Sequence, residues 1–412
     1  MAGSSITETW EYKTDIITSY DGHEQRIKTR VYPRRKISFD YPAMDKLQAQ
    51  WLRGMARIRQ NEAYYIPQWH TPIRLKSDHL GGLALFIEER HMLSLYDCEY
   101  IEVFVRDEVN SGSSPNIVAK VHYYSDGVIG LVNPMPRDLL KANTWIFPLK
   151  RCSLQPVSGL EYIWANGSNV TLSFEDLLIK PATVQVPGKY VTQYQWYKQM
   201  NRWSLPEQID GRQVFRNSPQ WVEDSNLTLS VEKATNRLDN YTGTFVYDLK
   251  NWRSYDIHTM ELSLMCREAI NNMIVFFARV CGRFNSFYAP TWVNDVTVIK
   301  DIYIGESFVY VDWDDIAQYY KNNARPKKIV AFTKDWKSYI ASILGYSYDM
   351  VNGKKVGKIL LAQPAQANLS KDLILMTSYI NLVRFDSDTL QLNFETDEVA
   401  NVTLIMREVD DV

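Results

Sequence analysis

The histidines of this 412-residue chain are the first residues whose types suggest chemistry. His70 and His79 lie close together in the sequence, with Asp78 beside the second, and zinc accepts both residue types as ligands. A metal site needs further ligands that converge on one point. We instead interpret the two histidines as residues at the turns that flank a strand. The sequence therefore predicts no bound metal.

Three acids surround Trp313: Asp312, Asp314 and Asp315. Paired carboxylates can act as general acid and base, for example in glycoside hydrolysis. A group of acids this dense is also typical of a solvated turn after a strand, and we adopt that interpretation. The chain contains no Walker loop and no GxGxxG, HExxH, GxSxG or paired CxxC motif. We therefore expect no enzyme, no catalytic residue and no cofactor.

The four cysteines are scattered along the chain, at Cys98, Cys152, Cys266 and Cys281, so we expect free thiols and no disulfide framework. The net charge of −2 gives no electrostatic sign of nucleic acid or an anionic membrane as a partner. No apolar run approaches the roughly 18 residues that cross a bilayer, and the first residues lack the pattern of a signal peptide. We expect a chain made and kept in a reducing cytoplasm.

Two stretches, residues 37–69 and 260–292, share one pattern. Each has a short alternating run, a segment with helical periodicity, an aromatic pair and a Pro-x-Trp sequence. Trp69 and Trp292 set the offset at 223 residues (292 − 69). An internal repeat of this kind indicates a duplicated structural unit. We expect three parts: a first domain over residues 1–189, an aromatic connector over 190–219 and a second domain over 220–412.

The helical segment of each repeat should form an amphipathic helix that lies on a sheet. Pro42 suits the first turn of the first helix. That helix should bury Met44, Leu47, Trp51, Leu52, Met55 and Ile58. The second should bury Cys266, Ile270, Met273, Ile274, Phe277 and Val280, and more deeply, because it is more apolar. The core should also take Tyr65, Pro67 and Trp69 and their counterparts Tyr288, Pro290 and Trp292.

Alternating runs bounded by turn residues predict strands in both halves. In the first half the runs are 25–32, 83–86, 100–105, 117–124, 145–149 and 170–174. In the second half they are 244–249, 308–311, 328–332, 358–362, 382–385, 390–394 and 402–406. The pattern predicts an α+β, mainly β fold, with two tandem β-sandwich domains that each carry one flanking amphipathic helix.

Several of these segments resemble the distal tail proteins of long-tailed bacteriophages and related gene-transfer particles. In the first half the resemblance rests on Gly22-His23-Glu24-Gln25-Arg26, Pro33-Arg34-Arg35, the helix and the aromatic-x-Pro-x-Trp segment. In the second half it rests on Leu238-Asp239-x-x-Thr242-Gly243, Phe287-Tyr288-x-Pro290-Thr291-Trp292, Asp295, residues 383–388 and residues 407–409. The duplication is similar to that of baseplate hub proteins, which carry two tube-like domains in one chain. Distal tail protein and hub both stay open.

The resemblance implies a tail-tube-like fold that assembles into rings and brings no catalytic residues. It implies a structural component of the virion tail tip, a ring-forming adaptor between the tail tube and the baseplate or fibre apparatus, assembled in the bacterial host cytoplasm. The implied partners are further copies of the chain, in a trimer or a hexamer, and tail tube, tape measure and other baseplate or fibre proteins. The alternative is a carbohydrate-binding or hydrolytic module of a phage receptor-binding protein, which the aromatic and acidic residues motivate. The residues of the interface stay unknown, and no membrane or sequence-specific nucleic acid is expected as a partner.

Overall fold

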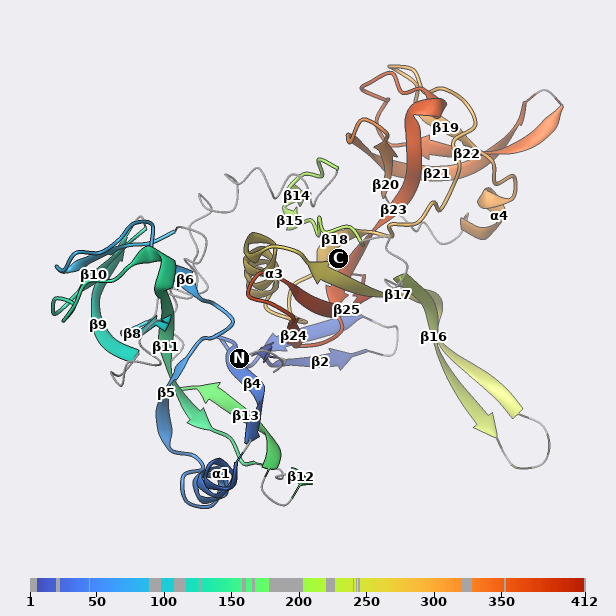
Figure 1. The fold of residues 1–412 in the computed structure, drawn as a ribbon. Helices are drawn as coiled ribbons and strands as arrows, with labels where there is room; N and C mark the ends of the chain where they lie inside the picture. The colour runs from blue at the N-terminus through green and yellow to red at the C-terminus, as the bar shows by residue number, and fades with distance from the viewer. Residues whose placement is uncertain are drawn as a thin grey trace.

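The computed structural model is mainly β, as expected, with antiparallel strands and a few short helices (Figure 1). It describes residues 6–19, 23–43, 45–88, 98–106, 116–125, 127–157, 161–164, 167–177, 203–219, 227–239, 241, 243, 245–320, 328–351 and 353–410. Most of the strands in these ranges pair into one large sheet of 21 strands. No helix in these ranges is long and apolar enough to cross a membrane.

Four strands of each half lie side by side in the same order. The first unit has the order β1 (Ile6–Glu11), β4 (Arg34–Ala43), β13 (Gly167–Asp176) and β12 (Glu161–Trp164). The second unit has the order β16 (Leu227–Asp239), β17 (Phe245–Leu264), β25 (Ala400–Glu408) and β24 (Thr389–Phe394). In both units an arm strand precedes its hairpin partner, and a strand from the end of that half follows.

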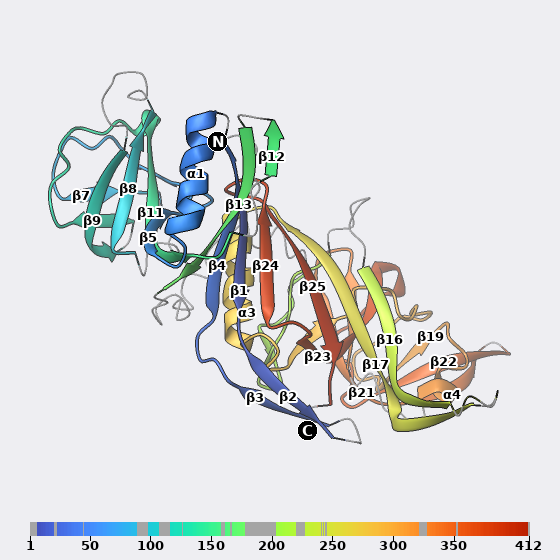
Figure 2. The same cartoon turned by 90° about the horizontal axis from the view of Figure 1, so that it is seen from below.

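The two units form one continuous sheet, because β1 pairs with β24 as well as with β4. The pairing is antiparallel and runs from Ile6 opposite Phe394 to Glu11 opposite Thr389. Figure 2 shows β4, β1, β24 and β25 next to one another, with α3 behind them. Segments from the two ends of the chain therefore meet at the centre of the molecule.

One helix packs against each unit: α1 (Lys46–Ile58) and α3 (Arg267–Val280). Asp45 caps α1, because its side chain accepts a hydrogen bond of 2.8 Å from the backbone nitrogen of Gln48. The prediction that Pro42 opens this helix is wrong. Pro42 lies in β4, where it pairs with Asn169 of β13, because the strand continues to Ala43 before the chain turns into the helix.

The two helices differ in burial. The predicted face of α3 is covered, and nine of its residues are buried, as expected for the more apolar helix. In α1 only Ala49 and Leu52 are buried. Leu47, Trp51 and Ile58 are 77%, 58% and 77% exposed, so the predicted burial of this face is wrong. At about 100° per residue these three side chains form a stripe on the side of α1 opposite Ala49 and Leu52. Met44 lies outside the described residues.

Each half continues into a strand-rich lobe with its own buried cluster. The first lobe contains β5 (Ala63–Pro67), β6 (Ile73–Arg74), β7 (Ala84–Phe86), β8 (Tyr100–Val105), β9 (Asn116–Ser125), β10 (Val128–Leu131) and β11 (Thr144–Leu154). The second contains β18 (Phe287–Pro290), β19 (Phe308–Val311), β20 (Lys328–Thr333), β21 (Ser338–Val351), β22 (Lys354–Leu361), β23 (Ile374–Phe385) and the short helix α4 (Ile316–Tyr320). Short 3₁₀ turns precede β11 and β23.

Strand pairings and turn contacts recur between the lobes. The partners of β11 are β5, β8 and β13, and the corresponding partners of β23 are β18, β20 and β25. The Asp78 carboxylate accepts a hydrogen bond from the backbone nitrogen of Lys141, and Asp301 accepts one from that of Lys371. These correspondences support a duplication. The domain boundaries at residues 189 and 219 stay a prediction.

Among the residues assigned to the core, Trp292 is 1% exposed and Trp69 packs on the cluster beneath α1. Tyr65 is 43% exposed, so its assignment is wrong. Its ring faces away from that cluster and lies 5.0 Å from the ring of Tyr100 in an edge-on contact. The predicted strand over residues 25–32 is shorter than expected, since β3 (Glu24–Lys28) ends before it.

The connector is described from residue 203 to 219, and its earlier part lies outside the described residues. It contains the two-stranded β14 (Gln208–Ile209) and β15 (Arg212–Gln213). Trp203 is buried against Trp292 and Phe332, with ring centroids 6.1 and 5.0 Å away. Phe215 lies in edge-on contact with Phe276 of α3. The described part of the connector therefore packs on the second half.

Gly282 tests how tightly the second half holds the N-terminal segment. Its φ is +64°, and an added Cβ would lie 2.7 Å from Asp388 Oδ1 and 3.2 Å from Tyr12 Cβ. Gly305 is a matched control, with φ +92° and nothing within 4 Å of an added Cβ. Both alanine variants pay the cost of a left-handed backbone, roughly 1–2 kcal/mol. We expect Gly282→Ala to lower the melting temperature by several degrees more than Gly305→Ala in calorimetry, and equal shifts would contradict the contact.

Candidate functional site

Both units begin with a long hairpin, which we call the first arm (residues 6–43) and the second arm (residues 227–264). The outer part of the first arm pairs β2 (Thr14–Thr18) with β3, and Thr14 lies opposite Lys28. The second arm pairs Thr235 with Leu249 in the same way. Both ends of the hairpin keep an offset of 221 residues (235 − 14 and 249 − 28). The two arms therefore correspond residue by residue in this region.

The first arm is docked on the second half, at the C-terminal end of α3. Tyr12 is 2% exposed and its ring lies 5.8 Å from that of Phe277. Its backbone nitrogen donates to the carbonyl of Asp388 at 2.8 Å. Lys28 Nζ lies 3.1 Å from the sulfur of Cys281, and the Arg26 guanidinium donates to the carbonyl of Phe284. These contacts extend the β1–β24 pairing along the arm.

An ion pair fixes the tip side of the first arm. The guanidinium of Arg384 donates to both carboxylate oxygens of Glu24, each at 2.8 Å, and also to Asp386. The Arg384 side chain is 2% exposed and that of Glu24 is 14% exposed. Burial alone raises the pKa of Glu24, but the hydrogen bonds and charges of Arg384 and Arg26 outweigh it and hold this pKa below its usual value. The carboxylate therefore stays charged.

The turn at Asp388 is a second fixed point of this contact. Its carboxylate accepts hydrogen bonds from the backbone and hydroxyl of Thr14, at 2.6 and 3.0 Å. It also accepts from the backbone nitrogen of Arg283, just after α3, at 2.9 Å. One side chain thus holds the first arm, the end of α3 and the β23–β24 turn together.

A polar cluster lies at the base of the first arm, between the two units. Glu8 is 2% exposed, and its carboxylate contacts Arg35 Nε at 2.5 Å and His70 Nε2 at 3.0 Å. Burial opposes its charge, but Arg35 and His70 outweigh burial and hold the pKa of Glu8 well below its usual range. Burial lowers the pKa of His70, so a neutral ring donates its Nε2 proton to Glu8. Arg35 also donates to Gln68 at 2.9 Å.

Arg267 connects this cluster to the second half. It is the first residue of α3, it is 4% exposed, and its guanidinium donates to the carbonyl of His70. The guanidinium also lies over the Phe394 ring of β24, 5.3 Å from the ring centre. Burial lowers the pKa of Arg267 to about 10. The junction therefore combines backbone pairing, charge and aromatic contact.

The second arm has no corresponding cover among the described residues, and Figure 1 shows it projecting away from the rest of the chain. Its large exposed side chains are Leu229 (41%), Val231 (71%), Leu238 (58%), Tyr241 (97%), Phe245 (48%), Val246 (66%) and Tyr247 (57%). Apolar side chains gathered on an exposed hairpin mark a contact surface. The sequence reasoning did not identify this surface, although the recurring hairpin pattern was visible in it.

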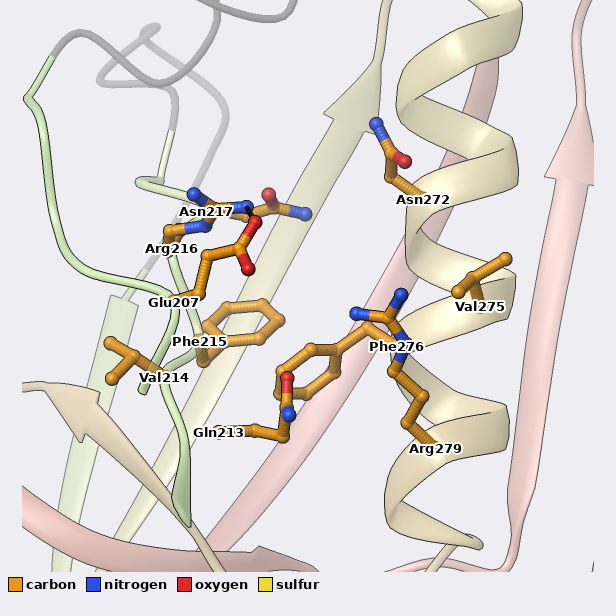
Figure 3. Close-up of a pocket in the computed structure, with 10 residues that line it drawn as sticks. All are labelled: Glu207, Gln213, Val214, Phe215, Arg216, Asn217, Asn272, Val275, Phe276 and Arg279. Atoms are coloured by element: carbon orange, nitrogen blue, oxygen red, sulfur yellow. Dashed lines mark ion pairs between the residues drawn. The ribbon is translucent and has the colours of Figure 1, made fainter. Parts of the chain in front are cut away.

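Two pockets were searched for chemistry. Figure 3 shows the one between the connector and α3, where Phe215 and Phe276 lie face to edge and Arg216 pairs with Glu207 at 3.7 Å. Its volume of about 40 Å³ is close to the space of one water molecule. A larger pocket of about 480 Å³ in the second lobe is mostly apolar, and its Lys328 is paired with Asp210 at 2.8 Å. Neither pocket brings two carboxylates together.

The residues first considered for chemistry lie apart or are engaged elsewhere. His70 contacts Glu8, whereas buried His79 forms a β-bridge with Leu139. Asp315 pairs with Lys355 at 2.7 Å, and Asp312 accepts from the backbone of Thr297, in the turn after β19. The described residues contain no group of three His, Cys, Asp or Glu side chains placed for a metal ion. The four cysteines form no disulfide.

A carboxylate that sequence reasoning left unassigned lies between the second unit and its lobe. Asp295 accepts hydrogen bonds from the Thr291 hydroxyl and from the backbone nitrogen of Tyr379. Burial raises its pKa to about 6, against the effect of these bonds. A raised pKa of this kind suits a general acid, but it also follows from burial alone. The two pockets described above do not include Asp295 among their lining residues.

The Glu24–Arg384 pair yields a stability prediction with a control on the other arm. Arg384→Met leaves the Glu24 carboxylate without its bidentate partner, so we expect a loss of about 3–5 kcal/mol in the free energy of unfolding. Arg407→Met removes the partner of Glu232, whose side chain is 53% exposed, and should cost less than about 1 kcal/mol. Urea unfolding measures both, and similar costs would contradict the role of Arg384.

His258 yields a pH prediction. It is fully buried in β17, neither ring nitrogen has a hydrogen-bond partner among the described residues, and burial lowers its pKa to about 4. Between pH 6.5 and about 4 the unfolded chain binds a proton that the folded chain excludes, so the free energy of unfolding falls as the pH falls. We expect His258→Phe to flatten this slope. The same change at exposed His122 should leave the slope in place, and a persistent slope in His258→Phe would refute the assignment.

The geometry thus provides a junction inside the chain and an exposed second arm, and no assembled catalytic group in the described residues. Comparison with known proteins adds nothing to this picture. No protein-family model matches the chain, and no curated protein matches it. The function has to be argued from the arrangement of the chain's own residues.

Proposed function

We propose that this chain is a structural component of a bacteriophage tail tip, a ring-forming adaptor between the tail tube and the baseplate or fibre apparatus. The observation that supports this most is the pair of corresponding four-strand units joined edge to edge by β1 and β24. Units of one design placed side by side can extend into the wall of a tube. A ring needs this property of its subunits.

The exposed surface supports an assembling protein. The second arm and the α1 stripe carry apolar side chains at an exposure that monomeric proteins rarely show in contiguous patches. Both surfaces lie at the ends of the continuous sheet, away from the junction between the units. The identification with a tail tip rests on the resemblance of the short motifs, among them Gly22 to Arg26 and Phe287 to Trp292.

The number of copies follows from symmetry. Tail tubes in the systems that the chain resembles are six-fold rings. Three copies with two units each give six equivalent positions, whereas six copies are needed if only one unit of each chain forms the tube wall. We favour the trimer, because the two units already lie in one sheet within the chain. Closed rings of this type need head-to-tail contacts.

Native mass spectrometry of the purified protein should give a closed oligomer, and electron microscopy should show a ring. Antibodies raised against the chain should label the distal end of the tail on the intact particle that carries it. A protein that stays monomeric at micromolar concentration would overturn the proposal. Polysaccharide binding or hydrolysis by that monomer would instead support the receptor-binding alternative.

A further inference from the structure

The contact between the two units inside the chain provides a template for a contact between chains. Its two elements are the pairing of β1 with the β24 edge and the docking of the first arm at the end of α3. Both belong to the same face of the molecule. If the units correspond, the same two elements can join the second unit of one copy to the first unit of another.

The free edges of the sheet have the right identity for this. At one end of the sheet β16 pairs with β17, and at the other end β12 pairs with β13, with no further strand partner for either among the described residues. By position in their units, β16 corresponds to β1, and β12 corresponds to β24. Strand edges with open backbone groups are sites where another chain adds by pairing. The edges that remain open are thus the counterparts of the two strands already joined.

Burial differs between corresponding positions as this template requires. Trp10 lies opposite Arg35 in the first unit, and Leu229 lies opposite the corresponding His258 in the second. Trp10 is 5% exposed, because the second half covers it, whereas Leu229 is 41% exposed. Beyond these positions Tyr12 is 2% exposed and Val231 is 71% exposed. The second arm therefore presents outward the side that the first arm buries.

The side chains at the tip of the arms change in a correlated way. With the offset of 221 residues, Phe245 corresponds to Glu24 (245 − 24), and Tyr247 corresponds to Arg26. On the receiving side, Ser153 corresponds to Arg384, because Cys152 lies opposite Tyr64 as Val383 lies opposite Phe287. Both partners of the charged pair are replaced together, so no charge would lose its partner in the contact between copies.

The receiving helix changes to match an apolar arm. The first arm docks at the C-terminal end of α3, and the corresponding surface of the first unit is the C-terminal end of α1. Ile58 lies there at 77% exposure, with Trp51 one and two turns away at 58%. Aromatic Phe245 and Tyr247 and apolar Ile58 and Trp51 are chemically complementary. This answers why α1 exposes the face that its periodicity assigns to a core.

We propose that β16 of one copy pairs with the β12 edge of a second copy, and that the second arm covers the C-terminal part of α1 in that copy. The proposal rests on the ring-forming function proposed above and specifies its contact. The occupant of the surface is another copy of this chain, because the contact continues the β1–β24 interface with corresponding elements. The two surfaces differ, so the contact is head-to-tail and each copy offers one of each.

Mixing two variants tests this arrangement. The arm variant is Val231→Asp with Phe245→Asp, and the helix variant is Trp51→Asp with Ile58→Asp. All four side chains are exposed, so melting temperatures should match the wild type. Leu344→Asp is the control, at a residue of β21 that is 71% exposed and lies outside the proposed contact. We expect each variant alone to lose the oligomer in native mass spectrometry, at a concentration where the wild type and the control are fully assembled.

A mixture of the two variants should give a heterodimer and nothing larger, because only the arm of the helix variant and the helix of the arm variant are intact. Wild-type rings that persist in both variants would overturn this contact and leave the ring function standing. A wild type that does not assemble would overturn the ring function itself. Hydrogen exchange on the assembled wild type gives a second readout: protection of β16 and β12 is expected, and rapid exchange at both would refute the pairing.

Discussion

The backbone pairing of β1 with β24 is the interaction on which the rest of this structure depends. It joins the beginning of the chain to its end and turns two separate four-strand units into one sheet. A sheet edge that stayed open at this point would expose unpaired backbone groups in the middle of the molecule. The pairing also sets where the first arm begins, and so brings Tyr12 and Glu24 onto the second half.

Charged side chains make this junction selective. Burying Glu8 or Arg384 costs free energy that a partner in good geometry only offsets, so the pairs contribute less to stability than to position. A shifted register between β1 and β24 would move Glu8 away from Arg35 and His70 and leave buried charges without partners. The junction therefore has one favourable arrangement, and the two units are held in a defined relation.

The corresponding helices show how duplicated elements diverge when their neighbours differ. In α3 the sheet lies on one side, and the connector with Phe215 and the first arm with Tyr12 add cover. In α1 the sheet covers Ala49 and Leu52, and the stripe of Leu47, Trp51 and Ile58 stays exposed. The two helices have similar periodicity, but only the second finds its outer partners within its own chain. The proposed contact between copies supplies the missing neighbour of the first.

Local pattern was enough to predict most of the individual elements. The runs at 308–311 and 390–394 are strands with those bounds, because alternating apolar side chains need a half-buried strand. The repeat of Trp69 and Trp292 led to the corresponding order of strands, and the absence of familiar motifs agrees with a site that contains no assembled catalytic group in the described residues. These features depend on neighbours within a few residues or on two similar segments of the same chain.

Tertiary structure decided the features that depend on distant partners. The β1–β24 pairing joins residues almost the whole chain apart, and no local pattern specifies which edge a strand will choose. The outward face of α1 follows from which side meets the sheet, and periodicity gives an apolar face without its direction. Burial of Glu8 and Arg384 likewise needs partners from other elements. The sequence determined the repeating elements of this protein, and their packing decided which of the repeated surfaces are covered and which stay exposed.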